Sequence, residues 1–327
     1  FIKICRLLDY EIIDQNNFYL PVTDQYINED LSKIGKRSLT IPMGKVEITR
    51  PVKSLTIILR TCASVNMLTQ SKKRIFDQEK SEYTFRSLNS IINSLNFAKE
   101  LFDNVKLELI IVDHNSEKSV VDKIKLIISN QFFKSRFISL NVDDFKKDIN
   151  SKNEKNEKVT LNQMSNMSNI HQSLILAKES DDLIYFVEDD YIHSIHAIKE
   201  MIFTYEKLSS MLKTELILCP SDYPYLYSEI ENAKIFLGNK SHWRSIKETL
   251  CTFLTSKQMV MKYWDELTSM CKFEHYPFEK PLHNIYEKEY CLSPIPSIAI
   301  HCTNINSIFG LSPNVDWKKT WEESELK

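Results

Sequence analysis

The segment LIYFVEDDYIHS, residues 183–194, joins a strand pattern to a cluster of acids. Its first five residues are apolar or aromatic, as in a strand that is covered on both faces. The pattern then ends on Glu188, Asp189 and Asp190. Because three neighbouring carboxylates repel one another, we expect a bound counter-ion at this point. The alternative is an acid cluster in the first turn of the next helix, expected at 194–212.

The chain upstream of this segment alternates between strand and helix patterns. Three short apolar runs indicate buried strands: 55–59, 107–112 and 136–140. Three stretches repeat apolar residues at three- and four-residue spacing, as helices with one buried face do: 81–102, 120–132 and 164–177. This alternation predicts an α/β fold of the Rossmann-like kind, with a mostly parallel central sheet and helices on both faces.

Polar residues follow three of these predicted strands. Arg60 and Thr61 follow the first strand, Asp113 and Asn115 follow the second, and the acid cluster follows the strand at 183–187. In open α/β sheets, ligands bind beyond the carboxyl ends of the strands. We therefore expect these side chains to converge on one site. For Asp113, capping of the following helix is an alternative role.

The sequence holds only four glycines, Gly35, Gly44, Gly238 and Gly310. Neither the G-x-G-x-x-G of dinucleotide-binding folds nor the GxxxxGK[ST] of P-loops occurs. Backbone binding of a diphosphate is therefore not expected. The other common arrangement is a divalent cation, Mg²⁺ or Mn²⁺, that carboxylates hold and that binds the phosphates in turn. The acid cluster predicts such a site.

The remainder of the chain is less regular. Residues 141–160 are charged and Asn-rich, which predicts a solvated loop. Ser256 is expected to cap a helix that reaches Met270. A hairpin or loose cap is expected within residues 1–50. Four further short strands are expected: 215–219, 234–238, 249–254 and 297–301.

Composition narrows the class of protein. A formal net charge of −2 gives no general attraction for nucleic acid. Seven cysteines without a CxxC pair favour reduced thiols in a cytoplasmic protein over disulfides or a zinc ribbon. No apolar run reaches the ~18 residues of a membrane span, so peripheral association with a membrane is the form left open. The chain begins with Phe1 rather than Met, so an anchor or partner domain outside it also stays open.

These segments resemble the GT-A fold glycosyltransferases, most closely glycosyltransferase family 2. LTIILRT (55–61) is similar to the first strand of that family, and LIIVDHNS (109–116) is similar to the second. The stretch NMSNIHQSLILAKESDDLIYFVEDDY (166–191) is similar to the Asn-bearing helix of that family and the following strand with the Asp-x-Asp motif, with Glu188 in place of the first Asp. The resemblance covers about residues 55–309, in pieces.

The resemblance implies a role for each residue of the donor site. Asp113 would bind the nucleobase and Asp190 would ligate the metal. Glu188 or Asp189 would contact the ribose or a metal-bound water. Arg60, Thr61 and Asn115 are added to the predicted donor site because they follow the first two strands; Arg60 is expected either to meet phosphate or to pair with a surface acid.

Residues 275–301 resemble the region that carries the general base in this family, commonly an x-Glu-Asp motif at a helix start. Glu279 lies at the base position, although Lys280 replaces the expected Asp, and Glu274 is the alternative base. His301 ends a strand where many GT-A enzymes place a metal-binding His. An imidazole beside carboxylates favours Mn²⁺ over Mg²⁺.

Two aromatic and polar segments are expected to be loops, SDYPYLY at 221–227 and SHWR at 241–244. Aromatic faces stack on sugar C–H surfaces, while polar groups bind hydroxyls. Tyr223, Trp243 and Arg244 are therefore predicted to contact a sugar acceptor, with packing inside the loops as the alternative.

The expected activity is metal-dependent, inverting transfer of a sugar from a nucleotide-sugar to a glycan, lipid-linked or protein hydroxyl. The implied division of the chain is an extension (1–50), a glycosyltransferase domain (51–310) and a tail (311–327). Within the domain, 55–190 is the donor half and 191–310 is the acceptor half. One rival is a nucleotidyltransferase, although RTCASVN (60–66) lacks its glycine-rich signature. The other is a non-catalytic carbohydrate-binding or scaffold domain.

Overall fold

The computed structural model describes residues 2–8, 10, 38–41, 44–64, 74–228 and 232–326. Near the N-terminus it contains the short helix α1 (Ile2–Leu7) and a hairpin of β1 (Ser38–Ile41) and β2 (Gly44–Glu47). The hairpin expected within the first 50 residues is therefore present, and most of the remaining extension lies outside the described ranges.

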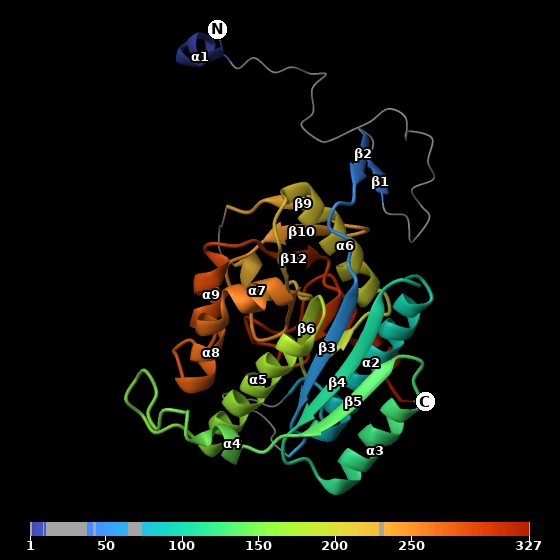
Figure 1. The fold of residues 1–327 in the computed structure, drawn as a ribbon, viewed down its shortest axis with the longest axis vertical. Helices are drawn as coiled ribbons and strands as arrows, with labels where there is room; N and C mark the ends of the chain where they lie inside the picture. Colours follow the sequence, from blue (N-terminus) through green and yellow to red (C-terminus); the bar gives the residue numbers. More distant parts are fainter. Residues whose placement is uncertain are drawn as a thin grey trace.

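A nine-stranded sheet forms the centre of the molecule, in the order β5-β4-β3-β6-β11-β8-β12-β10-β9 (Figure 1). Its strands have these bounds: β3 (Ser54–Thr61), β4 (Lys106–Asp113), β5 (Lys134–Ser139), β6 (Leu183–Glu188), β8 (Ile217–Leu218), β9 (Ile235–Leu237), β10 (His242–Ser245), β11 (Phe253–Ser256) and β12 (Cys291–Ile295). The first four strands in this order run parallel, and β12 pairs parallel with β8, whereas the other pairs are antiparallel. The predicted α/β class is confirmed, with a mixed arrangement beyond β6.

Burial explains why the parallel strands are continuous apolar runs. All eight residues of β3 are buried, and Leu55, Ile57, Ile58 and Leu59 have no exposed surface. A strand that is covered on both faces cannot alternate polar and apolar residues. Each fully buried Leu or Ile contributes about 1.5–3 kcal/mol to folding.

The helices that connect the parallel strands lie on both faces of the sheet: α2 (Lys80–Lys99), α3 (Lys118–Ser129) and α5 (Leu161–Glu179). From β3 the chain moves outward to β4 and β5, and it then returns past β3 to β6. Right-handed crossovers therefore place α2 and α3 on one face and α5 on the other, as Figure 1 shows. The direction reverses between β3 and β6, which marks this point as the ligand-binding crevice of the sheet.

After β6 the chain forms a separate two-stranded antiparallel sheet. Strand β7 (Tyr191–His193) pairs antiparallel with β13 (Ala299–His301), and helix α6 (Ala197–Leu212) begins only after β7. The acid cluster therefore lies between two strands. The alternative that placed it in the first turn of the next helix is wrong.

Several boundaries differ from the sequence predictions. Residues 141–160 are not a simple solvated loop, because they contain α4 (Asp143–Lys146) and bury Phe145, Ile149 and Val159. Ser256 does cap a helix, accepting a hydrogen bond from the Met259 N–H. That helix is divided at residue 263 into two parts, α7 (Lys257–Lys262) and α8 (Trp264–Lys272).

Several elements were not expected from sequence, among them the 3₁₀ helix η2 (Pro224–Tyr227), β7, β10, β12 and α10 (Trp317–Glu323), whereas α9 (Lys280–Tyr286) begins after Glu279, where the resemblance implied a helix start. The tail helix α10 packs against the start of α2, where Trp321 stacks on Phe76 with ring centroids 3.9 Å apart. Arg86 of α2 also donates to the Trp321 carbonyl. This contact fixes the segment that leads into α2, including residues 74–80. No helix in the described part of the chain is long and apolar enough to cross a membrane.

Candidate active site

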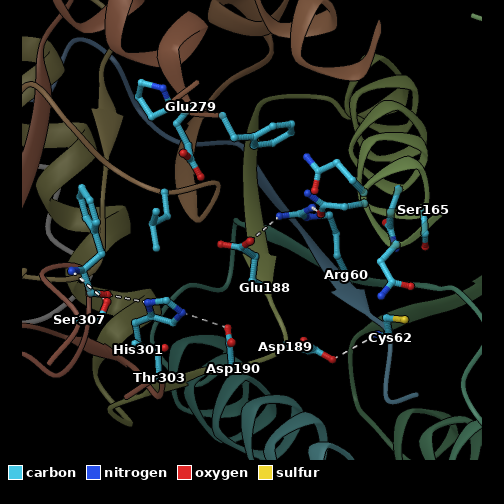
Figure 2. A pocket seen from close by; sticks show the side chains of 18 of the residues that line it. Arg60, Cys62, Ser165, Glu188, Asp189, Asp190, Glu279, His301, Thr303 and Ser307 are labelled. Atoms are coloured by element: carbon cyan, nitrogen blue, oxygen red, sulfur yellow. Dashed lines mark hydrogen bonds and ion pairs between the residues drawn. The ribbon is translucent and has the colours of Figure 1, made fainter. Parts of the chain in front are cut away.

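A cavity of about 610 Å³ opens at the carboxyl ends of β3 and β6, where the topology predicts a ligand site. Its volume suits a small-molecule ligand. Figure 2 shows Glu188, Asp190 and His301 on one wall, with Glu279 reaching toward them from the opposite wall. The predicted convergence of the first and third strand ends is therefore confirmed.

Asp189 is buried and fully engaged by its surroundings. It accepts hydrogen bonds from Lys80 Nζ (2.5 Å), Thr84 Oγ1 (2.8 Å) and the Cys62 backbone N–H (3.2 Å). These partners come from α2 and from the end of β3. Asp189 therefore ties α2 to the sheet, and it also lines the cavity.

Glu188 lies on the cavity wall beside Arg60. The two side chains form an ion pair of 3.1 Å, and Arg60 also donates to Asn166 Oδ1 (3.0 Å) on α5. The Thr252 hydroxyl donates to Glu188 at 3.2 Å. Arg60 is buried, whereas about 30% of the Glu188 side chain is exposed. Glu188 thus keeps a face that a ligand hydroxyl can reach.

Asp190 and His301 meet because the β7–β13 ladder pairs Tyr191 with His301. His301 Nε2 lies 3.5 Å from Asp190 Oδ1, and the other Asp190 oxygen accepts from Arg74 Nη1 at 3.0 Å. Burial alone raises the pKa of Asp190, but His301, Lys80 and Arg74 outweigh it and hold that pKa well below its usual range. Burial lowers the pKa of His301, and Asp190 more than offsets this, so the imidazole pKa is raised.

Each acid of the cluster therefore has a basic partner from the chain itself. Arg60 pairs with Glu188, Lys80 with Asp189 and Arg74 with Asp190, three pairs in all. The expectation that mutual repulsion requires a bound cation is corrected by these pairs. A metal at this site needs support from other observations.

The geometry of His301 and Asp190 supplies such support. Nδ1 of His301 lies 2.6 Å from the Phe309 carbonyl, so the N–H on Nδ1 donates there and Nε2 faces Asp190. Metal-binding imidazoles typically donate their second N–H in this way. Within the described ranges no group of three or more His, Cys, Asp and Glu side chains could hold a metal. The residues fit a divalent cation that Asp190 and His301 would share with phosphate oxygens and water, rather than a closed structural site.

Glu279 is the N-cap residue of α9 and lines the same cavity. Burial, together with repulsion from Glu188, raises its pKa to about 7. Figure 2 shows its carboxyl group directed into the cavity toward Glu188. A carboxyl group with a pKa near neutral pH is well suited to accept a proton.

Glu274, the alternative base, also lines the cavity, on the loop that precedes α9. Lys280 is engaged outside the candidate bases, because its ammonium pairs with Glu154 at 2.5 Å. Glu154 also accepts the Tyr276 N–H at 2.8 Å. Lys280 therefore helps to hold the loop that carries both candidate bases.

Asp113 lies behind the cavity rather than in its wall. Its carboxylate is buried and accepts from the hydroxyl groups of Thr61 and Ser116, both at 2.6 Å. The N-cap of α3 is Glu117, so Asp113 does not cap that helix. Asn115 is exposed and adopts a left-handed conformation (φ 60°). Thr61 lines the cavity, and Asp113 holds it in place.

The predicted acceptor residues are corrected by the structure. Tyr223 and Trp243 are fully buried, so neither ring presents a face to a sugar. Tyr223 shares a hydrogen bond with Tyr191 (2.5 Å), and the indole N–H of Trp243 donates to Glu200 (3.3 Å). Arg244 pairs with Asp222 away from the cavity. Trp243 is part of the core because SHWR is strand β10 rather than a loop, and Tyr223 is buried directly before the 3₁₀ helix η2.

Sequence reasoning missed two sets of cavity residues. Arg74 and Lys80 precede or open α2 and carry no local motif. The amino-terminal turns of α5 line the cavity with short polar side chains: Asn162, Gln163, Ser165, Asn166 and Asn169. The low apolar content at the start of that helix was the available signal.

The sequence matches no protein-family model and no curated protein. Among solved structures, TarS of S. aureus is similar at 12% identity and a TM-score of 0.34, over 64% of this chain and 29% of that one. Galactosyltransferase LgtC in complex with donor and acceptor sugar analogs is similar at 8% identity and a TM-score of 0.36, over 82% of this chain and 94% of that one. Mouse xyloside xylosyltransferase 1 is similar at 11% identity and a TM-score of 0.38, over 72% of this chain and 76% of that one.

The chain spans less than half the length of the two TarS structures it matches, 29% of one and 48% of the other. Likenesses at this level assign neither a family nor an activity to the chain.

Proposed function

We propose that this protein is a glycosyltransferase of the GT-A kind, which transfers a sugar from a nucleotide-sugar to a hydroxyl acceptor. The proposal is carried by two sets of side chains that face each other across one cavity. Asp190 and His301 lie on one wall, and Glu279, whose pKa is raised to about 7, lies on the other. One wall suits the phosphate end of a donor, and the other holds a base. The cavity volume of about 610 Å³ admits a ligand of this size.

The donor would lie along the ends of β3 and β6. Asp190 and His301 would hold a divalent cation, Mn²⁺ being the better match for a His–carboxylate pair. When bound, such a cation neutralises charge on the departing nucleoside diphosphate. Glu188 offers an acceptor to a ribose hydroxyl, and the polar side chains at the start of α5 offer hydrogen bonds to the nucleoside.

Glu279 would take the proton from the acceptor hydroxyl as its oxygen attacks the anomeric carbon. Burial and the nearby Glu188 keep its pKa near the working pH, where a base is most effective. A direct attack of this kind would invert the configuration at the anomeric carbon. Glu274 is the second candidate for the base, on the same loop.

The acceptor would bind beside Glu279. Tyr276 and Phe278 line the cavity on the loop before α9, and Phe309 lines it from the facing side. Tyr276 is 66% exposed, and the Lys155 ammonium lies over one face of its ring, 3.1 Å from the centroid, so the other face is the one it would offer to a sugar. These residues take the place of the buried Tyr223 and Trp243 as the aromatic surface for a sugar.

The test is a panel of nucleotide-sugars, with Mn²⁺ and with chelator, on wild type and on Asp190→Ala. Binding of one nucleotide that requires both Mn²⁺ and Asp190, followed by slow hydrolysis of its sugar, is the expected result. The absence of binding to every donor in the presence of Mn²⁺ would exclude the proposal. Release of pyrophosphate from nucleoside triphosphates would instead indicate a nucleotidyltransferase.

A further inference from the structure

Arg74 binds the same carboxylate that is proposed to hold the metal. Its Nη1 donates to Asp190 Oδ2 at 3.0 Å and to the Cys302 carbonyl at 3.2 Å. Its guanidinium lies over the Tyr83 ring, 4.8 Å from the centroid. Only 10% of the Arg74 side chain and 15% of the Asp190 side chain are exposed, and both residues line the cavity. The charge of Asp190 is thus satisfied by the protein before any ligand binds.

The neighbouring acids are already engaged by other side chains. Both Asp189 oxygens accept hydrogen bonds, one from Lys80 and the other from Thr84. Glu188 is paired with Arg60. A metal ion at Asp190 therefore has to share that carboxylate with the Arg74 guanidinium, and two cations on one carboxylate repel each other.

We propose that Arg74 exchanges between Asp190 and the diphosphate of the donor, so that metal and nucleotide bind cooperatively. This inference rests on the proposed nucleotide-sugar function of the cavity. A guanidinium binds phosphate oxygens well, because its planar donors match them in pairs. Once Arg74 moves to the phosphates, its charge no longer opposes a metal that Asp190 and His301 hold. By linkage, each ligand then raises the affinity of the other by the same factor.

The backbone around Arg74 suits a side-chain movement of this kind. The next residue, Ile75, donates its N–H to the Thr303 carbonyl at 3.2 Å. Phe76 then stacks on Trp321 of the tail helix. Because both following residues are held, the exchange requires rotation of the Arg74 side chain and no rearrangement of α2.

The experiment measures Mn²⁺ binding by electron paramagnetic resonance, alone and with the nucleoside diphosphate that wild type prefers. Wild type should bind Mn²⁺ weakly alone and more tightly with the nucleotide, within the roughly 5- to 150-fold range of typical couplings. In Arg74→Gln, Mn²⁺ alone should bind at least about fivefold tighter, the nucleotide alone should bind more weakly, and the coupling should fall toward one. Arg136→Gln is the matched control, since Arg136 pairs with Glu108 on β4 outside the cavity, and it should behave as wild type.

Arg74→Lys provides a second variant if the Gln variant is unstable. It keeps the charge, so Mn²⁺ alone should stay weak. Wild-type Mn²⁺ affinity and coupling in Arg74→Gln would overturn the exchange. So would nucleotide binding that ignores chelator yet is lost in Arg74→Gln, because the guanidinium would then be a permanent cation for the phosphates.

Failure of the proposed function gives a different result. In that case wild type binds no nucleotide, with or without Mn²⁺. The measurement with Mn²⁺ alone still tests the competition on Asp190. Tighter Mn²⁺ binding by Arg74→Gln would support it, and unchanged binding would overturn it.

Discussion

The two walls of the cavity hold carboxylates under opposite electrostatic conditions. At the end of β6, each of the three acids has a basic partner within 3.1 Å, and the pKa of Asp190 is held well below its usual range. At the start of α9, burial and repulsion raise the pKa of Glu279 to about 7. A carboxyl group is thus kept ionised on one wall, whereas on the other wall the pKa of a carboxyl group lies near neutral pH. In the proposed mechanism this difference would separate a ligand-holding role from a proton-transfer role.

The largest expected effect comes from removing the base. Glu279→Gln should lower the transfer rate by about 10²- to 10⁴-fold, the usual contribution of a general base. Donor affinity should stay unchanged, because the proposed donor site lies on the other wall. Product formation and calorimetric titration of the donor would measure the two quantities separately.

Glu274→Gln is the matched control for this prediction, since it changes a Glu on the same loop. It should keep most of the activity. Loss of activity in Glu274→Gln with retention in Glu279→Gln would reassign the base. Retention in both variants would remove the base from this wall altogether.

The second prediction separates neighbours within the acid cluster. Asp189→Asn should destabilise the protein by about 3–5 kcal/mol, because it leaves Lys80 as an unpaired buried charge. Asp190→Asn should cost less stability, because Arg74 keeps its hydrogen bond to the Cys302 carbonyl and its contact with the Tyr83 ring. Urea unfolding of both variants measures this, and the double variant Asp189→Asn/Lys80→Met should recover part of the loss. Equal stability of the two single variants would contradict the structural role of Asp189.

The sequence predicted those features that depend on neighbouring residues. The run at 183–187 reads as a buried strand by itself, and its final acids show where a ligand can bind. The partners of these acids could not be predicted, because Arg74 and Lys80 approach only when α2 packs on the sheet. The raised pKa of Glu279 has the same origin, since Glu188 and the covering side chains come from distant segments.

The acceptor residues show the opposite failure, in which a local pattern was misleading. An aromatic and polar stretch such as SHWR suits either an exposed loop or a strand that buries alternate residues. Strand β10 pairs with β9 and β12, and this pairing carries Trp243 into the core. Only the tertiary structure distinguishes the two outcomes.

The third prediction concerns pH. Glu279 acts as a base only when ionised, so kcat/KM should rise about tenfold per unit below pH 7 and level off above it. Its folded-state pKa lies above the usual 4.5, so its contribution to stability is present below about pH 4.5 and is lost as the pH rises through about 7. Glu279→Gln should remove this loss, so it should be more stable than wild type at pH 8 but not at pH 4. Identical stability profiles for the two proteins would contradict the raised pKa.

The smallest expected effect tests the acceptor side. Tyr276→Ala should raise the acceptor KM by about fivefold, as a loss of roughly 1 kcal/mol of contact energy implies. The donor KM should stay constant, because Tyr276 lies on the loop of Glu279 and not at the β6 end. Tyr223→Phe is the control: it removes a buried hydroxyl whose partner is Tyr191, and it should lower stability without changing the acceptor KM. If Tyr223→Phe raised the acceptor KM and Tyr276→Ala did not, the acceptor would bind on the Tyr223 side and the two-wall arrangement would be wrong.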